Sequence, residues 1–384
     1  MQSSYVSSMT EISSRAFEAA TIPNMTAQEA ADLLMHAVQI RTFADILRSH
    51  AQGMEPKQAL VKGLCANDPQ RNRASVEKKV RDWLSGRYQP TAREDLLELC
   101  FIMELSLDEA DEFLAEAGES GLHWRDPREL VYAFALRRRM NYLEAQDLLR
   151  RVLPQEIDLE GSGESESFTP LIHKEADAIQ TEEELRQYLT QAADRLGTLH
   201  NSAYRQFLEL MSVLEKPQSY VGEEKRYTSR EIVEQYLDKH LPSKRGGKAM
   251  SEKLKSILVG WPDEVTISRM KNRKADVSRK ILILLFLATD GGEPEEESWE
   301  ECDAYEEEIE EEDEAELDFR SSYMRMNQML AGCGYRMLDP RNPFDWIALY
   351  CMRVQEDRES MDGLNERLAH VLDVLFTAAP SGDQ

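Results

Sequence analysis

The sequence predicts an all-α protein built from two copies of one helical module. Apolar residues recur at helical spacing along most of the 384 residues, and no segment shows the sustained alternation that is typical of strands. The duplication is predicted by internal similarity. Residues 114–137 align without a gap with residues 330–353, a shift of 216 positions, and the identical pairs include Leu114/Leu330, Gly118/Gly334, Leu122/Leu338, Arg125/Arg341, Pro127/Pro343 and Arg137/Arg353.

A second similarity has a shift of 186 positions. It aligns Gly86 with Asn272, Arg93 with Arg279, and the apolar run that begins at Leu96 with the run that begins at Leu282. The two shifts differ by 30 residues, which indicates one insertion in the later copy.

Changes in composition predict where the modules begin and end. Residues 1–24 are rich in Ser, Thr and Ala and are expected to be a flexible lead-in, while residues 155–170 form an acidic linker rich in Gly and Ser. The first module is therefore predicted at 25–154 and the second at 171–384. The second is interrupted at 291–318 by an acidic insert that we expect to be disordered, because dense like charges repel and offer little to bury.

In the first module, helical patterns cover residues 26–38, 43–53, 56–67, 74–84, 92–105, 106–118, 126–140 and 141–154. Thr26 with Glu29, and Ser106 with Glu109, have the spacing of capping boxes. Gly86 and Pro90 are expected to end the fourth helix, and Pro127 stands at a favoured first helical position.

In the second module the same order is predicted at residues 181–217 (one helix or two), 229–242, 251–261, 265–274, 279–292, 322–334, 342–354 and 364–376. The tryptophans, among them Trp83 and Trp346, are expected in the hydrophobic cores. Trp346 aligns with Leu130 in the repeat, which favours this interpretation.

Charge is distributed very unevenly. The net charge is −26, but residues 293–318 hold seventeen acidic residues and no basic one, so the rest of the chain carries only −9. Residues 71–93 and 266–280, at equivalent places in the repeat, each have a local excess of about five positive charges. The overall acidity therefore does not exclude nucleic acid as a partner.

Several function classes have no sequence support. The five cysteines and seven histidines lack metal-ligand spacing, so no metal and no cofactor is expected. The segment SKRGGKAMS lacks the first glycine of a phosphate-binding loop, and no hydrolase or kinase motif is present, so no enzyme is expected. No apolar run is long enough to span a membrane and no secretory signal is apparent, which predicts a cytoplasmic protein without a membrane partner.

Each copy has a characteristic set of residues at the end of one helix and the start of the next. They are Trp83, Leu84, Gly86, Pro90, Arg93 and Leu97 in the first copy, and Ile267, Ser268, Arg269, Asn272, Arg273 and Ser278 in the second. With these residues and this order of helices, the module resembles the helix-turn-helix domain of the Cro and phage-repressor (XRE-like) class over roughly 60 residues per copy.

In that family the third helix enters the major groove and nearby basic side chains hold phosphates. The resemblance implies that the first copy binds through Ser75, Lys78, Lys79 and Arg81, with Arg71, Arg73 and Arg87 on phosphates. In the second copy it implies Thr266, Ser268, Arg269, Lys271 and Arg273, with Lys274 on a phosphate.

The leading hypothesis is a regulator of transcription or of a mobile element that binds duplex DNA. Two third helices in one chain would act as an internal pseudo-dimer that reads two half-sites about 34 Å apart. The alternative is a non-catalytic adaptor or scaffold that binds a protein partner. The acidic insert would be a solubilising loop, a tether, or a nucleic-acid mimic. The basic faces would bind phosphate, or remain solvated and pair with the insert. Target sequence and oligomeric state are left open.

Overall fold

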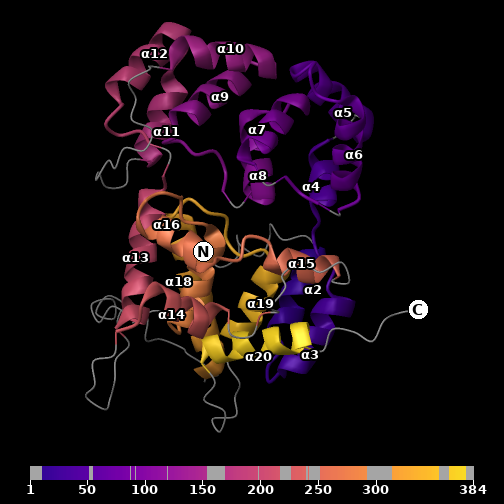
Figure 1. Ribbon diagram of the computed structural model, residues 1–384, viewed down its shortest axis with the longest axis vertical. Helices are drawn as coiled ribbons and strands as arrows, with labels where there is room; N and C mark the ends of the chain where they lie inside the picture. The colour runs from indigo at the N-terminus through magenta and orange to yellow at the C-terminus, as the bar shows by residue number, and fades with distance from the viewer. Residues whose placement is uncertain are drawn as a thin grey trace, which may run out of the picture. The chain divides into compact units, whose positions relative to one another are not determined.

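The computed structural model describes residues 11–51, 55–86, 88–90, 92–118, 120–153, 169–197, 199–216, 226–238, 241, 251–291, 314–353 and 363–377 (Figure 1). All regular secondary structure in these ranges is helical, and one isolated antiparallel bridge joins Ser120 to Tyr335. The fold is all-α, as the sequence predicts. None of the helices described combines the length and the hydropathy needed to cross a bilayer.

Residue contacts divide the chain into two compact units. The α4–α12 unit comprises residues 41–202 with 333–336, and the α13–α20 unit comprises residues 1–40, 203–332 and 337–384. Each unit has its own interior and is described by itself.

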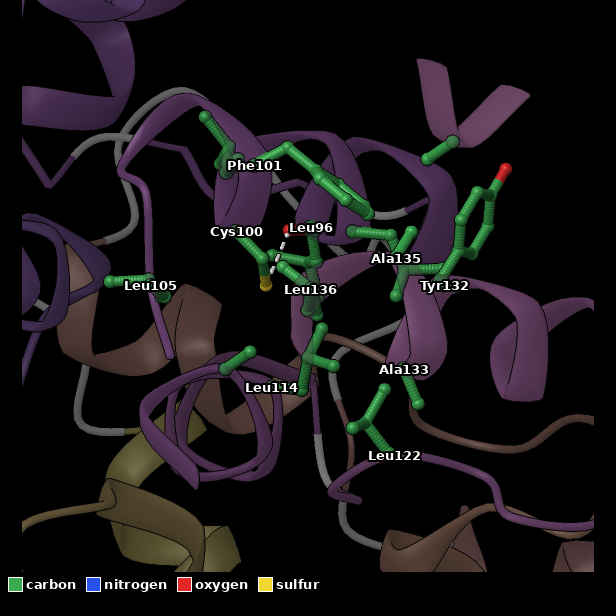
Figure 2. Close-up of a cluster of buried hydrophobic side chains, with 14 of the residues drawn as sticks. Leu96, Cys100, Phe101, Leu105, Leu114, Leu122, Tyr132, Ala133, Ala135 and Leu136 are labelled. Atoms are coloured by element: carbon green, nitrogen blue, oxygen red, sulfur yellow. Dashed lines mark hydrogen bonds between the residues drawn. The ribbon is translucent and has the colours of Figure 1, made fainter. Parts of the chain in front are cut away.

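The α4–α12 unit contains nine helices in its described residues. All nine contribute buried side chains to one core, and Figure 2 shows its part between α7, α8 and α9. Leu96 and Cys100 of α7 point toward Leu114 of α8 and Leu136 of α9, and the Cys100 thiol contacts the carbonyl oxygen of Leu96 (Figure 2). The helices are α4 (Phe43–His50), α5 (Pro56–Asn67), α6 (Arg73–Leu84), α7 (Arg93–Ile102), α8 (Leu107–Gly118), α9 (Pro127–Arg137), α10 (Tyr142–Val152), α11 (Thr169–Ala178) and α12 (Glu182–Gln191).

The α13–α20 unit is organised around α17 (Arg279–Ala288), all ten residues of which are buried. An apolar helix of this kind needs neighbours on every side, and α18, α19 and α20 pack against it. The other helices are α2 (Glu11–Ala20), α3 (Ala27–Asp32) with a π-helical turn η1 (Leu33–Ala37), α13 (Asn201–Glu215), α14 (Ser229–Ile232) with a π-helical turn η2 (Val233–Leu237), α15 (Glu252–Leu258), α16 (Glu264–Lys271), α18 (Glu314–Gly332), α19 (Pro343–Met352) and α20 (Leu364–Thr377).

The units do not follow the module boundaries predicted from sequence. Helices α2 and α3 precede the first repeated segment, yet they pack against α19 and α20. Helices α11 and α12 precede the second repeated segment, yet α12 packs against α10, and Arg137 of α9 donates to the carbonyl oxygens of Ala176 and Asp177 in α11. Helices α2 and α3 therefore belong to the unit of α19 and α20, and α11 and α12 belong to the unit of α9 and α10.

The flexible lead-in predicted at residues 1–24 is wrong for residues 11–20, which form α2. Ala16 and Ala20 are buried, and the Ala16 carbonyl oxygen accepts a hydrogen bond of 3.0 Å from the Trp346 indole. The ring of Phe17 lies edge-on to that of Tyr323 at 5.6 Å. Small residues let α2 approach α19 closely, a feature that composition alone does not reveal.

The predicted range of the disordered insert, residues 291–318, extends too far at both ends. Gly291 belongs to a turn after α17, and α18 begins at Glu314. Glu316 pairs with Arg353 at 2.6 Å and with Arg320 one turn further along the helix at 3.3 Å, which explains why this acidic end is helical. Residues 292–313 and the predicted linker 155–168 lie outside the described residues.

Candidate nucleic-acid interface

Helix α6 carries most of the basic residues predicted in the first copy, and its sequence defines both of its ends. The side chain of Asn72 caps it by accepting hydrogen bonds from the backbone N–H groups of Ala74 and Ser75, at 2.9 and 3.3 Å. After its last turn, Gly86 has a φ of +71°, which glycine adopts without strain. Pro90 follows and prevents the helix from continuing.

One face of α6 is buried. Val76, Val80 and Trp83 lie in the core of the unit, and the ring of Phe43 lies edge-on to Trp83 at 6.1 Å. Helical periodicity places Lys78 and Arg81 on the opposite face. Both side chains are exposed, and neither forms an ion pair with a described residue.

The other predicted residues of this segment are less available. Lys79 pairs with Asp95 at 2.9 Å and lies 4.9 Å above the Trp83 ring. Arg73 forms an exposed pair with Glu77, a neighbour one turn away. Ser75 is exposed.

Arg71 is held by hydrogen bonds to other residues of the unit. Its guanidinium bonds Glu98 at 2.8 Å and the Leu64 carbonyl oxygen at 3.3 Å. The hydrogen bond to Glu98 raises the pKa of Arg71. We therefore do not expect Arg71 to be released for phosphate. Arg87 lies outside the described residues.

Helix α16 is the helix that the sequence repeat predicts to correspond to α6, and it is shorter. Asp263 caps it by accepting from the backbone N–H of Thr266 at 2.7 Å, and Ile267 and Met270 are buried. Ser268 and Arg269 are exposed and Thr266 is half-buried. The Arg269 guanidinium donates to the Lys274 carbonyl oxygen at 3.4 Å, and the Lys274 side chain is exposed.

Two basic residues at the end of α16 contact α13. Lys271 pairs with Glu215 at 2.5 Å, and its carbonyl oxygen accepts a hydrogen bond of 3.0 Å from the Tyr204 hydroxyl. The Arg273 guanidinium lies 4.6 Å from the centre of the Tyr204 ring. Lys271 is exposed and Arg273 half-buried, but both side chains contact α13.

The aligned position of Gly86 also needs correction. The residue with positive φ after α16 is Arg273, at +55°, and not Asn272. Gly86 and Arg273 each donate a backbone hydrogen bond to the residue three positions earlier, Trp83 and Met270 respectively. The connection after α6 is therefore one residue longer than that after α16, which a fixed shift of 186 positions cannot represent.

A bidentate ion pair is formed by the first residue of the helix after α6, and another by the first residue of the helix after α16. Arg93, the first residue of α7, bonds both carboxylate oxygens of Glu129 at 2.8 Å, and Arg279, the first residue of α17, bonds both oxygens of Asp345 at 2.8 Å. Burial opposes the charge on Arg93, but the hydrogen bonds and charge of Glu129 outweigh it and raise the pKa of Arg93. The arginines are 186 positions apart and the carboxylates 216 positions apart.

The hydrogen bonds around these pairs recur at the same spacing. Glu129 accepts from the backbone N–H of His123, and Asp345 accepts from that of Asp339, both at 2.8 Å. The N–H of Leu122 bonds the Asp111 side chain, as that of Leu338 bonds the Asn327 side chain. Sequence analysis missed Glu129 and Asp345, although the 216-position shift aligns them and would have revealed a repeated carboxylate.

The capping boxes predicted for Thr26 with Glu29 and for Ser106 with Glu109 are confirmed. Asp126 and Asn342 cap α9 and α19, and each is followed by a proline at the first helical position. Trp83 and Trp346 are buried in the cores.

His123 is a buried titratable group beside the Arg93–Glu129 pair. Its ring stacks on His200 at 3.9 Å, and its Nε2 atom has no hydrogen-bond partner among the described residues. Burial, followed by the charges of His200, Arg93, Arg125 and Arg128, holds the pKa of His123 well below its ordinary value.

Lowering the pH below about 6.5 is expected to destabilise this unit, because the unfolded chain then binds a proton that His123 in the folded unit does not. The free energy of unfolding should fall by up to about 1.4 kcal/mol per pH unit from this group. We expect His123→Phe, which keeps an aromatic ring on His200, to reduce this dependence between pH 5.5 and 7.5 in urea unfolding.

His36→Gln is the control, because His36 is exposed. It should unfold with the pH dependence of the wild type. The same slope in wild type and His123→Phe would contradict this account of His123.

Two exposed lysines of α5 escaped the sequence analysis. Lys57 and Lys62 lie on the helix that packs beside α6, and neither forms an ion pair with a described residue (Figure 1). They lie just outside the segment of highest local charge. Only the structure distinguishes lysines that are exposed on a helix from lysines that bond other parts of the protein.

The chemistry available on α5 and α6 is that of fixed cations rather than acid–base catalysis. Lys and Arg side chains bind phosphate oxygens, and both also donate to guanine O6 and N7 in the major groove. Within the described residues, no three His, Cys, Asp or Glu side chains are grouped so that they could hold a metal ion.

Comparison of the chain with protein-family models, with curated proteins and with solved structures finds no match.

Proposed function

We propose that this protein binds duplex DNA through a basic third helix of a helix-turn-helix module, and that it regulates transcription or a mobile element. The observation that carries the proposal is the outward face of α6, where Lys78 and Arg81 are exposed and form no ion pair with a described residue. Cations in this state exchange bound counterions for phosphates, which is the main source of affinity for DNA.

The order of helices supports the module assignment. Helices α5 and α6 are joined by a five-residue turn and pack against each other. Helix α4 precedes them and α7 and α8 come after them, which is the order expected for the domain (Figure 1). The two equivalent ion pairs, Arg93–Glu129 and Arg279–Asp345, support a second copy of the same module.

The direct test is fluorescence anisotropy of a mixed-sequence duplex over a salt series. The wild type is expected to bind at low salt, with an affinity that falls steeply as salt rises. The second protein lacks residues 293–312, which removes thirteen acidic residues and leaves α18 and the Glu316–Arg353 pair intact. If the insert competes for the basic face, this protein binds more tightly.

A third protein keeps the length of the insert but replaces every Glu with Gln and every Asp with Asn at residues 293–312. It distinguishes an effect of the charge of the insert from an effect of its length. It should bind as tightly as the deletion. No binding by any of the three at low salt would contradict the proposal.

A protein-binding adaptor is the second candidate. The observation in its favour is exposed apolar surface on and beside α16, where Val265 is 65% and Val259 46% exposed. Absence of DNA binding by all three proteins above would favour this candidate. Binding that depends on Lys78 and Arg81 would count against it.

A further inference from the structure

The segments that contain α5–α6 and α15–α16 have the same net charge, but their basic side chains make different contacts. Residues 55–85, which contain α5 and α6, hold seven basic and four acidic residues. Residues 251–274, which contain α15 and α16, hold six and three. Any difference in their ability to bind phosphate must therefore come from what each side chain contacts.

The first helix of each pair, α5 or α15, has a lysine at its second position. In α5 this is Lys57, which is exposed and forms no ion pair with a described residue. In α15 it is Lys253, whose Nζ donates to the carbonyl oxygens of Leu34, Met35 and Val38 at 2.7, 3.0 and 2.7 Å. Burial lowers the pKa of Lys253. Lys253 thus satisfies the carbonyl groups at the end of η1 and is not available to a ligand.

The third helices differ in the same way. The last turn of α6 contacts α4, where Arg48 donates to the Leu84 carbonyl oxygen at 2.8 Å, but Lys78 and Arg81 are exposed and pair with no described residue. On and after α16, Lys271 is bound to Glu215, Arg273 lies over Tyr204, and Arg269 donates to the Lys274 carbonyl oxygen. The exposed side chain of Lys274 is therefore the one cation here without a described contact.

Binding a phosphate at the end of α16 would cost these contacts. Lys271 would have to leave Glu215, whose carboxylate would remain near the phosphate and repel it. Arg273 would have to leave the aromatic face of Tyr204. Lys78 and Arg81 exchange only water and counterions, so the balance favours α6.

We infer that phosphate binding is confined to the α5–α6 surface, with Lys57, Lys62, Lys78 and Arg81 as the contacts, and that α16 takes no part. This inference rests on the proposed DNA binding and specifies it further. The protein then contacts DNA at one site per chain and does not read two half-sites with its two third helices.

Three double charge reversals test the inference by anisotropy with a mixed-sequence duplex. Lys78→Glu/Arg81→Glu changes α6, and Lys57→Glu/Lys62→Glu changes α5. Arg269→Glu/Lys274→Glu changes the exposed cations on and after α16 and is the matched control, because each variant lowers the net charge by the same four units. All six side chains are exposed, so the variants should fold, which circular dichroism verifies.

We expect the α6 variant to bind at least tenfold more weakly at low salt, with a salt slope that is shallower by about 2. The α5 variant should lose a similar part of the slope. The α16 variant should bind within about twofold of the wild type at about 0.15 M salt, where the Debye length is about 8 Å and charges that do not contact the DNA are screened.

Equal weakening by the α6 and α16 variants, or weakening by the α16 variant alone, would overturn the inference while leaving DNA binding established. An α5 variant with wild-type affinity would remove Lys57 and Lys62 from the contact set. A wild type that does not bind would instead contradict the proposed function itself.

Duplex length gives an independent measurement. Two half-sites about 34 Å apart need a duplex of about 20 base pairs or more. We expect the affinity per site to be the same for duplexes of about 12 and about 24 base pairs. A wild type that binds only the longer duplex tightly would contradict a single contact surface.

Discussion

Replacing Asp345 with alanine is expected to destabilise the α13–α20 unit by about 3 to 5 kcal/mol, the usual effect of breaking a buried ion pair. The side chains of Arg279 and Asp345 are only 8% and 2% exposed, so the variant leaves a buried guanidinium without its carboxylate. It also leaves the N–H of Asp339 without its acceptor. Urea unfolding followed by tryptophan fluorescence measures the change.

Two variants separate the pair from its surroundings. Arg279→Met/Asp345→Leu removes both charges together and should be much less destabilised, since no charge is left buried. Glu77→Ala removes the carboxylate of an exposed pair with Arg73 and should leave the unfolding midpoint nearly unchanged. A stability close to wild type for Asp345→Ala would show that the pair is not buried as described.

Replacing Trp346 with alanine is expected to cost about 3 to 5 kcal/mol, because a fully buried aromatic side chain leaves a cavity that the core cannot close. The indole is 0% exposed and donates its N–H to the Ala16 carbonyl oxygen. The loss should therefore also loosen α2. Urea unfolding measures the stability, and limited proteolysis measures cleavage within residues 11–20.

Trp346→Phe keeps an aromatic ring but not the N–H donor, so it should lie between wild type and Trp346→Ala in both measurements. Trp124→Ala is the comparison in the other unit, where the tryptophan is half-buried. Rapid cleavage of α2 in the wild type would contradict its packing against α19.

Local signals in the sequence predicted the helices well. Capping residues and prolines act within one turn, so Asp126 with Pro127 and Asn342 with Pro343 could be recognised without knowledge of the fold. The apolar run of α17 likewise predicted a buried helix.

The partners of helices could not be predicted in the same way. Nothing local distinguishes α2, whose buried face is Ala16 and Ala20, from a loosely held segment. Its position depends on Trp346, 330 residues away. The same holds for α11 and α12, which pack against helices that precede the linker.

The candidate site was predicted only as a set of charges. Sequence gives Lys78 and Lys271 the same weight, because both are lysines on a basic third helix. The structure separates them, since Lys271 meets Glu215 from a helix 56 residues earlier and Lys78 meets no described carboxylate. Availability of a cation depends on tertiary contacts, which periodicity and composition do not contain.

Photo-crosslinking tests the central claim most directly. Ser75 on α6 and Ser268 on α16 are both small, exposed residues of a third helix, and each can be replaced with p-benzoylphenylalanine. With a mixed-sequence duplex at low salt, we expect DNA to crosslink at position 75 and not at position 268. Crosslinking at 268 alone, or at neither position, would contradict the assignment of α6 as the DNA-binding helix.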